Sequence, residues 1–247
     1  MGQSEQYMKI NPFYFLYQYL IAWPVILVLT VLTAVSTIIL APLFPNSPVS
    51  HFPARWWSRL ICYLLFIRVE VTGLEKLKVT DSYIIAANHQ SIFDIFAMYG
   101  WLPNIFKWIM KAELRKIPLV GKACESAGHV FIDRSNPIAA QKSLKRAEKQ
   151  LINGVSVVIF PEGTRTKDGL MSKFKKGAFR IATDLLLPIV PVTIRGSFER
   201  LPRNTVYVSP GIIEMIFHDP IDVKLYDAEQ TPQLMQDTWH VINNDLQ

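Results

Sequence analysis

The feature that most restricts how this chain can fold is a long uncharged segment near its N-terminus. Residues 13–44 contain no charged side chain in 32 positions, whereas a helix needs about 20 apolar residues to cross the hydrocarbon core of a bilayer. Half of the 247 residues are hydrophobic and only 19% are charged, a balance that is unusual for a fully soluble domain. The sequence therefore predicts a protein that meets lipid.

Prolines and arginines divide this N-terminal region into two expected helices. Pro24 lies inside the uncharged segment, and three further prolines lie at or just after its end: Pro42, Pro45 and Pro48. This pattern favours a long kinked helix that stops in a proline-rich turn. Residues 54–67 then combine aromatic side chains with Arg55 and Arg59 one helical turn apart, which is typical of an amphipathic helix at a membrane interface.

The distribution of charge gives these helices an orientation. We expect a two-helix membrane anchor over residues 1–68 and a larger domain over residues 69–247. Basic residues follow the uncharged segment at Arg55, Arg59 and Arg68, so the positive-inside rule places the larger domain on the cytoplasmic side of the membrane. The chain has two cysteines without CxxC spacing, which fits a reducing compartment. The sequence leaves open whether the long helix crosses the bilayer.

Net charge indicates which partners the protein favours. The chain carries 26 lysines and arginines against 20 aspartates and glutamates, a formal charge of +6, which favours anionic lipid or a phosphorylated substrate. Nucleic acid is not expected, because the basic residues are not organised around a recognition helix or an RNA-binding motif.

From residue 69 onward, short apolar runs alternate with glycine, proline and charged residues. Such runs, bounded by turn residues, are typical of β-strands. The sequence predicts strands at 68–72, 83–87, 106–110, 129–132, 155–160, 189–194 and 212–217. Helical patterns lie between them, most clearly at 137–152 after the N-cap residue Asn136, and a last helix is expected at 232–246. Strands that alternate with helices predict the α/β class, here a layered αβα domain.

The segment after the second predicted strand places His89 five residues before Asp94. On a helix that spacing would turn the two side chains to different faces, so we expect His89 in a turn, Ser91 as the N-cap of a helix and Asp94 as its third residue. A carboxylate beside one ring nitrogen leaves the other free to accept a proton. The alternative, in which Asp94 only caps the helix and His89 is an ordinary turn residue, stays open on these residues alone.

Two further predicted strands end in polar turns. Asp133 and Arg134 follow one of them, and Glu162, Gly163 and Arg165 follow the other. Glycine lets a backbone approach a ligand closely, and the arginine fork suits phosphate oxygens. Each group also has a purely structural explanation, as a surface ion pair or a turn cap.

Taken together, these blocks resemble the four ordered motifs of the glycerolipid acyltransferase family. The first of these motifs contains a His-x4-Asp pair. The matching blocks are Asn-His-Gln-Ser with the following aspartate at 88–94, Gly-x-x-Phe-Ile-Asp-Arg at 128–134, Phe-Pro-Glu-Gly-Thr-Arg at 160–165 and Val-Pro-Val at 190–192. The resemblance spans about residues 70–200 and is specific, because four blocks recur in order with suitable spacing. Within the family, the chain is most similar to bacterial lysophosphatidate acyltransferases.

The resemblance implies transfer of a fatty acyl group from a thioester donor, acyl-CoA or acyl carrier protein, to the sn-2 hydroxyl of lysophosphatidate, which forms phosphatidate. It implies that His89 is the general base and that Asp94 orients it. It also implies membrane lipids as partners, no cofactor, no metal, and a catalytic domain over residues 69–247. The implied acceptor site consists of Glu162, Gly163, Thr164, Arg165, Arg134 and Lys111.

Two other functions stay open: the same chemistry on another acceptor, such as glycerol 3-phosphate or another lysophospholipid, and a non-enzymatic protein that binds anionic lipid. A hydrolase is disfavoured because the chain has no Gly-x-Ser-x-Gly turn to expose a nucleophile. A metalloenzyme is disfavoured because the five histidines show no HExxH or other paired spacing.

Overall fold

The strands of the larger domain form one sheet in a computed structural model, which describes residues 11–133, 154–227 and 229–246. Within these ranges the strands are β1 (Ile67–Thr72), β2 (Ile84–Ala87), β3 (Ile105–Lys111), β4 (Val130–Ile132), β5 (Val155–Ile159), β6 (Ile189–Arg195) and β7 (Gly211–Phe217). All seven predicted strands are confirmed, and no end differs by more than one residue.

The strand order is β1-β7-β6-β2-β5-β3-β4. β2 is parallel to both β5 and β6, β3 is parallel to β5 and β4, and only the β6–β7 pair is antiparallel among the paired strands that the structure describes. The carboxyl ends of β2, β3, β4, β5 and β6 therefore lie along one edge of the sheet.

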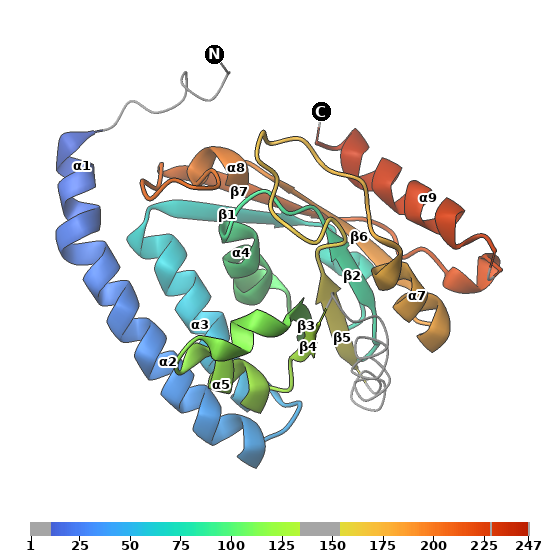
Figure 1. The fold of residues 1–247 in the computed structure, drawn as a ribbon, viewed down its shortest axis with the longest axis horizontal. Coiled ribbons are helices and arrows are strands. Elements are labelled where there is room, and N and C mark those ends of the chain that lie inside the picture. Colours follow the sequence, from blue (N-terminus) through green and yellow to red (C-terminus); the bar gives the residue numbers. More distant parts are fainter. Residues whose placement is uncertain (1–10, 134–153, 228, 247) are drawn as a thin grey trace.

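Helices cover both faces of the sheet (Figure 1). Alternate residues of β2 point to opposite sides: Ile85 belongs to the core shared with α3 (Pro48–Leu64) and α4 (Phe93–Trp101), while Ile84 belongs to the core shared with α7 (Lys176–Leu185) and α9 (Thr231–Asn244). Side chains that are apolar on both faces are expected for central parallel strands. The predicted layered αβα architecture is confirmed.

Short elements connect these layers. They are η3 (Leu74–Lys76), η4 (Ala112–Lys116), α5 (Val120–Ser126), α8 (Ser197–Arg200) and η5 (Val223–Leu225). The predicted last helix is confirmed as α9, and it buries Leu234 and Ile242. The helix predicted at 137–152 lies outside the described residues.

The uncharged segment forms one long helical rod along the side of the molecule (Figure 1). It comprises α1 (Pro12–Tyr17), a π-helical turn η2 (Gln18–Ala22) and α2 (Trp23–Leu43). Pro24 lies two residues after the π-helical turn, and the Trp23 backbone N–H bonds to the Gln18 carbonyl instead of the carbonyl four residues back. A π-turn of this kind lets a helix continue past a proline that cannot donate a hydrogen bond.

The return helix differs from the expectation at both ends. It begins at Pro48, because Ser47 caps it by accepting a hydrogen bond from the Ser50 N–H, and it ends at Leu64. Arg55 donates to the Leu102 and Pro103 carbonyls, and Arg59 donates to the Gly100 carbonyl. The spacing of the two arginines did not indicate this direction: the arginine stripe lies inward, where it satisfies carbonyl groups at the end of α4.

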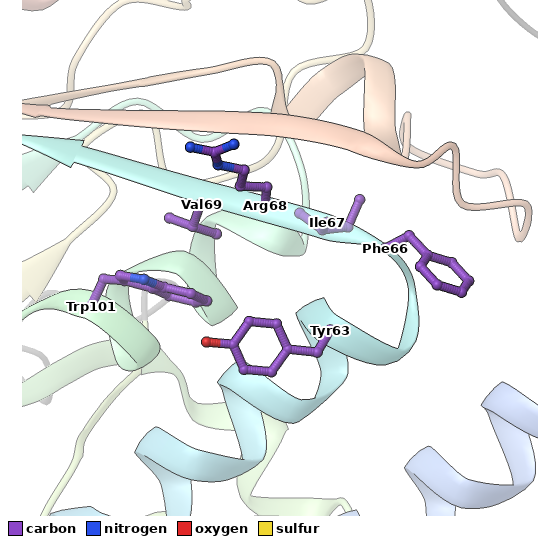
Figure 2. Close-up of a pocket in the computed structure, with 6 residues that line it drawn as sticks. All are labelled: Tyr63, Phe66, Ile67, Arg68, Val69 and Trp101. Carbon is purple, nitrogen blue, oxygen red and sulfur yellow. The ribbon is translucent and has the colours of Figure 1, made fainter.

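The outward face of α3 is apolar instead. Its exposed large side chains recur every three or four residues: Val49, Phe52, Trp56, Leu60 and Tyr63. This stripe ends at an open groove of about 500 Å³ lined by Tyr63, Phe66, Ile67, Arg68, Val69 and Trp101. Figure 2 shows the Tyr63 ring directed toward Trp101 across the groove, and the two rings meet edge to face at 6.4 Å between centroids.

Candidate active site

The candidate residues converge because of strand register. Ala86 of β2 lies beside Ile159 of β5, and Trp108 of β3 lies beside Val158. Since these strands are parallel, the residues that follow them emerge at the same edge. The turns that carry His89 and Glu162 are therefore neighbours, and Lys111 ends the next strand along.

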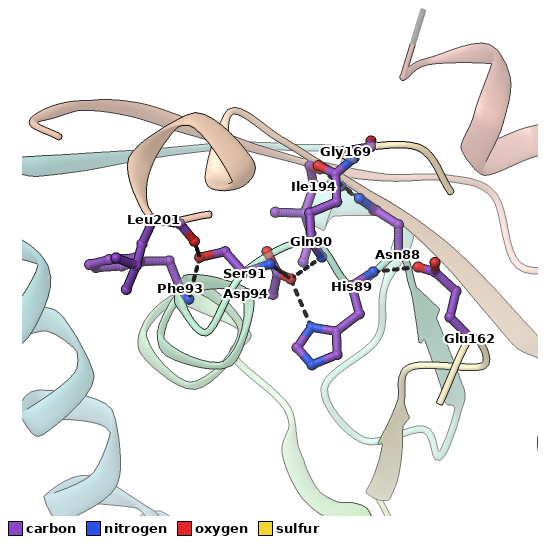
Figure 3. Close-up of polar contacts among 10 residues, drawn as sticks. All are labelled: Asn88, His89, Gln90, Ser91, Phe93, Asp94, Glu162, Gly169, Ile194 and Leu201. Carbon is purple, nitrogen blue, oxygen red and sulfur yellow. Dashed lines mark hydrogen bonds and ion pairs between the residues drawn. The ribbon is translucent and has the colours of Figure 1, made fainter. Parts of the chain in front are cut away.

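His89 and Asp94 are in direct contact, as the sequence predicts. The distance from His89 Nδ1 to Asp94 Oδ2 is 2.8 Å, and the Asp94 side chain is fully buried while that of His89 is 13% exposed. The same carboxylate oxygen accepts hydrogen bonds from the Gln90 and Ser91 backbone N–H groups at 2.7 and 2.8 Å (Figure 3). A carboxylate can only accept here, so the imidazole proton lies on Nδ1 and Nε2 keeps its lone pair.

The helix that carries Asp94 begins later than expected. α4 starts at Phe93, with Ile92 at the N-cap position, so Asp94 is its second residue and the prediction of Ser91 as N-cap was wrong. Ser91 Oγ still accepts a long hydrogen bond from the Phe93 N–H, at 3.4 Å, and it also donates to the Leu201 carbonyl at 2.8 Å. The Asp94 carboxylate accepts from the Gln90 and Ser91 N–H groups, which precede α4, so it holds the turn before the helix and does not cap the helix itself.

Phe160 fixes the plane of the His89 ring. The two rings are stacked with centroids 3.9 Å apart and an angle of 8° between planes, and Trp108 also stacks on Phe160, with 5.3 Å between centroids. Packing of this kind, together with the bond to Asp94, leaves the imidazole little freedom to rotate. The local sequence pattern does not indicate this role, although Phe160 ends a predicted strand.

Asn88 joins the catalytic turn to the sheet. Its side chain donates to the Ile194 carbonyl at 2.8 Å and accepts from the Ile194 N–H at 2.7 Å, and it is fully buried. The Asn88 amide therefore pairs with both the N–H and the carbonyl of Ile194, as a residue of a neighbouring strand would. Its position in the first motif was noted from the sequence, but its partner was not predictable, because 106 residues separate the two.

Glu162 is directed inward and binds backbone groups. Its carboxylate accepts from the His89 N–H at 2.7 Å and from the Ser172 N–H at 2.8 Å, and the residue is 2% exposed. Burial raises the pKa of the Glu162 carboxyl, while the two backbone hydrogen bonds act in the opposite direction. Glu162 therefore links the turn that carries His89 to the loop that follows β5.

We expect Glu162→Gln to lower the free energy of unfolding by about 1–3 kcal/mol, because the buried amide nitrogen of glutamine would face one of the two backbone N–H donors that the carboxylate now accepts from. The control is Glu75→Gln, the same substitution at an exposed position, which should change stability by less than about 0.5 kcal/mol. Urea unfolding in mild detergent measures both. Equal effects of the two substitutions would contradict the linking role of Glu162.

The other predicted residues lie around this centre, with one exception. Gly163 has a positive φ of 77° and donates its N–H to the Phe160 carbonyl at 2.9 Å, so the turn requires glycine. Thr164 is exposed, Arg165 is partly exposed, and Thr166 donates its N–H to the His89 carbonyl at 3.0 Å. Lys111 is exposed at the end of β3. Arg134 lies outside the described residues.

Residues of the loop after β5 add further ties that the sequence did not reveal. Gln90 Nε2 donates to the Gly169 carbonyl at 2.6 Å, and Arg203 donates to the Arg165 carbonyl at 3.3 Å. Among the described residues, no group of three or more His, Cys, Asp or Glu side chains is arranged to hold a metal ion.

Comparison with known proteins agrees with the motifs. The family model described as Acyltransferase matches residues 68–195, more than half of the chain. The chain belongs to this acyltransferase family. The matched region contains the His89–Asp94 pair, the β5 turn and the β6 block.

Several acyltransferases of known name are similar to the chain. The chloroplastic 1-acyl-sn-glycerol-3-phosphate acyltransferase BAT2 of Brassica napus is 36% identical over 173 residues, covering 69% of this chain and 50% of that protein. The 1-acyl-sn-glycerol-3-phosphate acyltransferase alpha of Homo sapiens is 40% identical over 181 residues, 73% of this chain and 64% of that protein. The chain spans about half the length of the plant relatives it matches.

A solved structure shares the fold along almost the whole chain. The 1-acyl-sn-glycerophosphate (LPA) acyltransferase PlsC from Thermotoga maritima is 29% identical with a TM-score of 0.77, and the match covers 95% of this acyltransferase and 94% of that chain. The similarity includes the N-terminal helices as well as the sheet, because so little of either chain is left unmatched.

Proposed function

We propose that the protein transfers a fatty acyl group from a thioester donor to the sn-2 hydroxyl of lysophosphatidate and so forms phosphatidate. The observation that carries the proposal is the His89–Asp94 pair, which leaves Nε2 free as a proton acceptor within a domain similar to enzymes named for this reaction.

The proposed reaction uses His89 twice. Nε2 takes the proton of the acceptor hydroxyl while its oxygen attacks the thioester carbonyl carbon, and the tetrahedral intermediate then collapses by breaking the C–S bond. The imidazolium returns the proton to the departing thiolate. Asp94 stabilises the imidazolium between these steps, because its buried carboxylate lies 2.8 Å from Nδ1. A new C–O bond replaces the C–S bond, and no covalent acyl-enzyme is needed.

We assign recognition of the acceptor to the loop after β5 and the neighbouring strand ends. Arg165, one residue before the Thr166 N–H that bonds to the His89 carbonyl, would bind the phosphate through its planar fork. Lys111 and Arg134 would add positive charge, and Gly163 and Thr164 would let the acceptor approach the backbone. Glu162 would position this loop rather than touch the acceptor, since both its oxygens already bind backbone N–H groups.

We propose that residues 1–68 anchor the catalytic domain, residues 69–247, at the cytoplasmic face of the inner membrane. The helical rod Pro12–Leu43 is long and apolar enough to cross a bilayer. The exposed apolar stripe of α3 and the Tyr63 and Trp101 rings at its end support contact with lipid, because tyrosine and tryptophan favour the membrane–water interface. An interfacial site lets the acceptor keep its acyl chain in hydrocarbon while its glycerol head meets His89.

A turnover assay of the purified protein in detergent tests the proposed acceptor and donor. We expect lysophosphatidate to be acylated with acyl-CoA, acyl carrier protein thioester or both, and glycerol 3-phosphate and lysophosphatidylcholine to be used much less. Lysophosphatidate combines a phosphate monoester, a free sn-2 hydroxyl and an acyl chain that can stay in hydrocarbon. Glycerol 3-phosphate lacks the acyl chain, and lysophosphatidylcholine carries a phosphodiester instead of the monoester. Turnover of glycerol 3-phosphate alone would overturn the proposed acceptor, and no turnover with any acceptor would favour a non-enzymatic lipid-binding protein.

A further inference from the structure

The connection between β3 and α5 exposes an unusual number of apolar side chains. Leu114 in η4 is 42% exposed, and Ile117 and Leu119 in the following turn are 43% and 45% exposed. Single apolar residues on a surface need no explanation, but three within six positions form a patch, and patches of this kind mark interaction sites. We call Leu114, Arg115, Lys116, Ile117 and Leu119 the η4 surface.

The chain holds the η4 surface in a fixed conformation. Leu119 has φ 60° and ψ −53°, a backbone conformation that costs a non-glycine residue free energy. The turn is pinned to α5 by hydrogen bonds from the Gly121 N–H to the Ile117 carbonyl and from the Ala123 N–H to the Leu119 carbonyl, both 2.8 Å long. A Cβ on Gly121 would collide with the Arg115 carbonyl. The hydrogen bonds to α5 and the close backbone contact at Gly121 therefore hold these apolar side chains in their exposed positions.

Positive charge accompanies the apolar side chains. Arg115 and Lys116 are exposed within the η4 surface. Arg115 extends over the Phe131 ring at 4.7 Å and lies 3.8 Å from Glu125, in a contact open to solvent. A pair of this length between exposed side chains is weak, so both cations are available to an anionic partner.

The η4 surface is continuous with the lipid-facing side of the anchor. α5 packs against η4 on one side and against α2 on the other, and Figure 1 shows α5 beside the long helical rod. The outer side of α2 exposes a run of large apolar residues: Leu27, Val28, Val31, Leu32, Val35, Ile39 and Leu43. Only one short helix, α5, separates a bilayer at α2 from the η4 surface.

We propose that the η4 surface is a second membrane contact and that its partner is the interfacial region of an anionic phospholipid bilayer. Leu114, Ile117 and Leu119 enter the upper acyl-chain region, and Arg115 and Lys116 lie at the level of the phosphates. An acidic protein would meet the same cations, but the neighbouring face of α2 is apolar, which favours lipid. The inference rests on the proposed membrane anchor and adds to it a contact inside the catalytic domain.

The contact has a function in the proposed reaction. η4 follows directly on β3, whose last residue is Lys111, and β3 pairs with β5. A bilayer held against the η4 surface would therefore fix the height of the carboxyl edge of the sheet above the lipid, where the acceptor has to meet His89.

Fluorescence quenching in vesicles tests the contact. Cys124→Ala removes the accessible native thiol, since Cys62 is buried, and an environment-sensitive fluorophore is then attached at Ile117→Cys. The full-length protein is reconstituted in vesicles of phosphatidylcholine and phosphatidylglycerol with a quencher on the lipid acyl chains, or with iodide in the buffer. Leu32→Cys on α2 serves as the lipid-contact reference. Leu225→Cys, 77% exposed on the opposite side of the sheet, is the matched control for an exposed leucine.

We expect the lipid-attached quencher to reduce emission from positions 117 and 32 and to leave position 225 unchanged, while iodide quenches only position 225. Quenching at 32 together with iodide quenching at 117 would overturn the η4 contact and leave the anchor standing. No lipid quenching at either position would overturn both. Shielding of position 117 from iodide only after acyl carrier protein is added would also overturn the proposal, in favour of a protein partner. Turnover of lysophosphatidate by each labelled variant shows separately whether the proposed reaction holds.

Discussion

Replacing His89 by alanine is expected to lower kcat for acyl transfer by about 10²–10⁴-fold, the range by which a positioned general base accelerates a reaction. The ring offers Nε2 as a proton acceptor at the carboxyl edge of β2, and Asp94 holds its other nitrogen at 2.8 Å. Alanine removes the proton acceptor and keeps the turn, because the bonds from the His89 N–H to Glu162 and from the Thr166 N–H to the His89 carbonyl are made by the backbone.

Two measurements separate loss of chemistry from loss of structure. The variant should sediment with anionic vesicles as the unaltered protein does, since the N-terminal helices lie apart from the substituted side chain. His240→Ala removes a histidine on the exposed side of α9 and should keep full turnover. If His89→Ala retained full activity, the assignment of the base would be refuted.

Asp94→Asn is expected to reduce kcat by about 10²–10⁴-fold with a smaller change in KM. Asparagine has nearly the same shape, and its oxygen can replace the Oδ2 atom that accepts from His89 Nδ1 and from two backbone N–H groups. The substitution therefore preserves the ring orientation but removes the negative charge that stabilises the imidazolium. Its amide nitrogen would take the place of Oδ1, which is buried without a hydrogen-bond partner.

The matched control for charge removal is Asp219→Asn, whose side chain is 84% exposed and pairs with Lys76 at 3.3 Å. It should leave kcat unchanged, because exposed pairs of this kind contribute little. Circular dichroism and the urea midpoint show whether Asp94→Asn is folded. A folded variant with unaltered kcat would mean that Asp94 only shapes the turn, the alternative that the sequence alone left open.

The sheet was predictable from the sequence because short apolar runs between turn residues have few other ways to be buried. All seven strands were found to within one residue, and the parallel arrangement of β2, β3, β4, β5 and β6 brings the polar ends of these five strands to one edge. The meeting of His89 with the β5 turn follows from that topology, and the His89–Asp94 contact follows from helix geometry.

Side-chain direction was less predictable. Helical spacing showed that Arg55 and Arg59 share a face, but it could not show that the carbonyls at the end of α4 lie opposite them. The position of Glu162 in a polar turn after a strand likewise did not indicate that both of its carboxylate oxygens bind backbone N–H groups. The stack of Phe160 on His89 joins residues 71 positions apart in the chain, so no local pattern announces it.

Both polar groups of the His89 peptide backbone are occupied by the loop after β5, its N–H by Glu162 and its carbonyl by the Thr166 N–H. Arg165 lies between these two partners in the chain. On the proposed assignment, Arg165 binds the acceptor phosphate and His89 removes the hydroxyl proton. The two backbone bonds therefore hold both residues in one rigid unit, at a fixed separation. An acceptor must then match this separation with the distance between its phosphate and its reacting hydroxyl. Substitutions in the loop that alter the choice of acceptor would also displace His89.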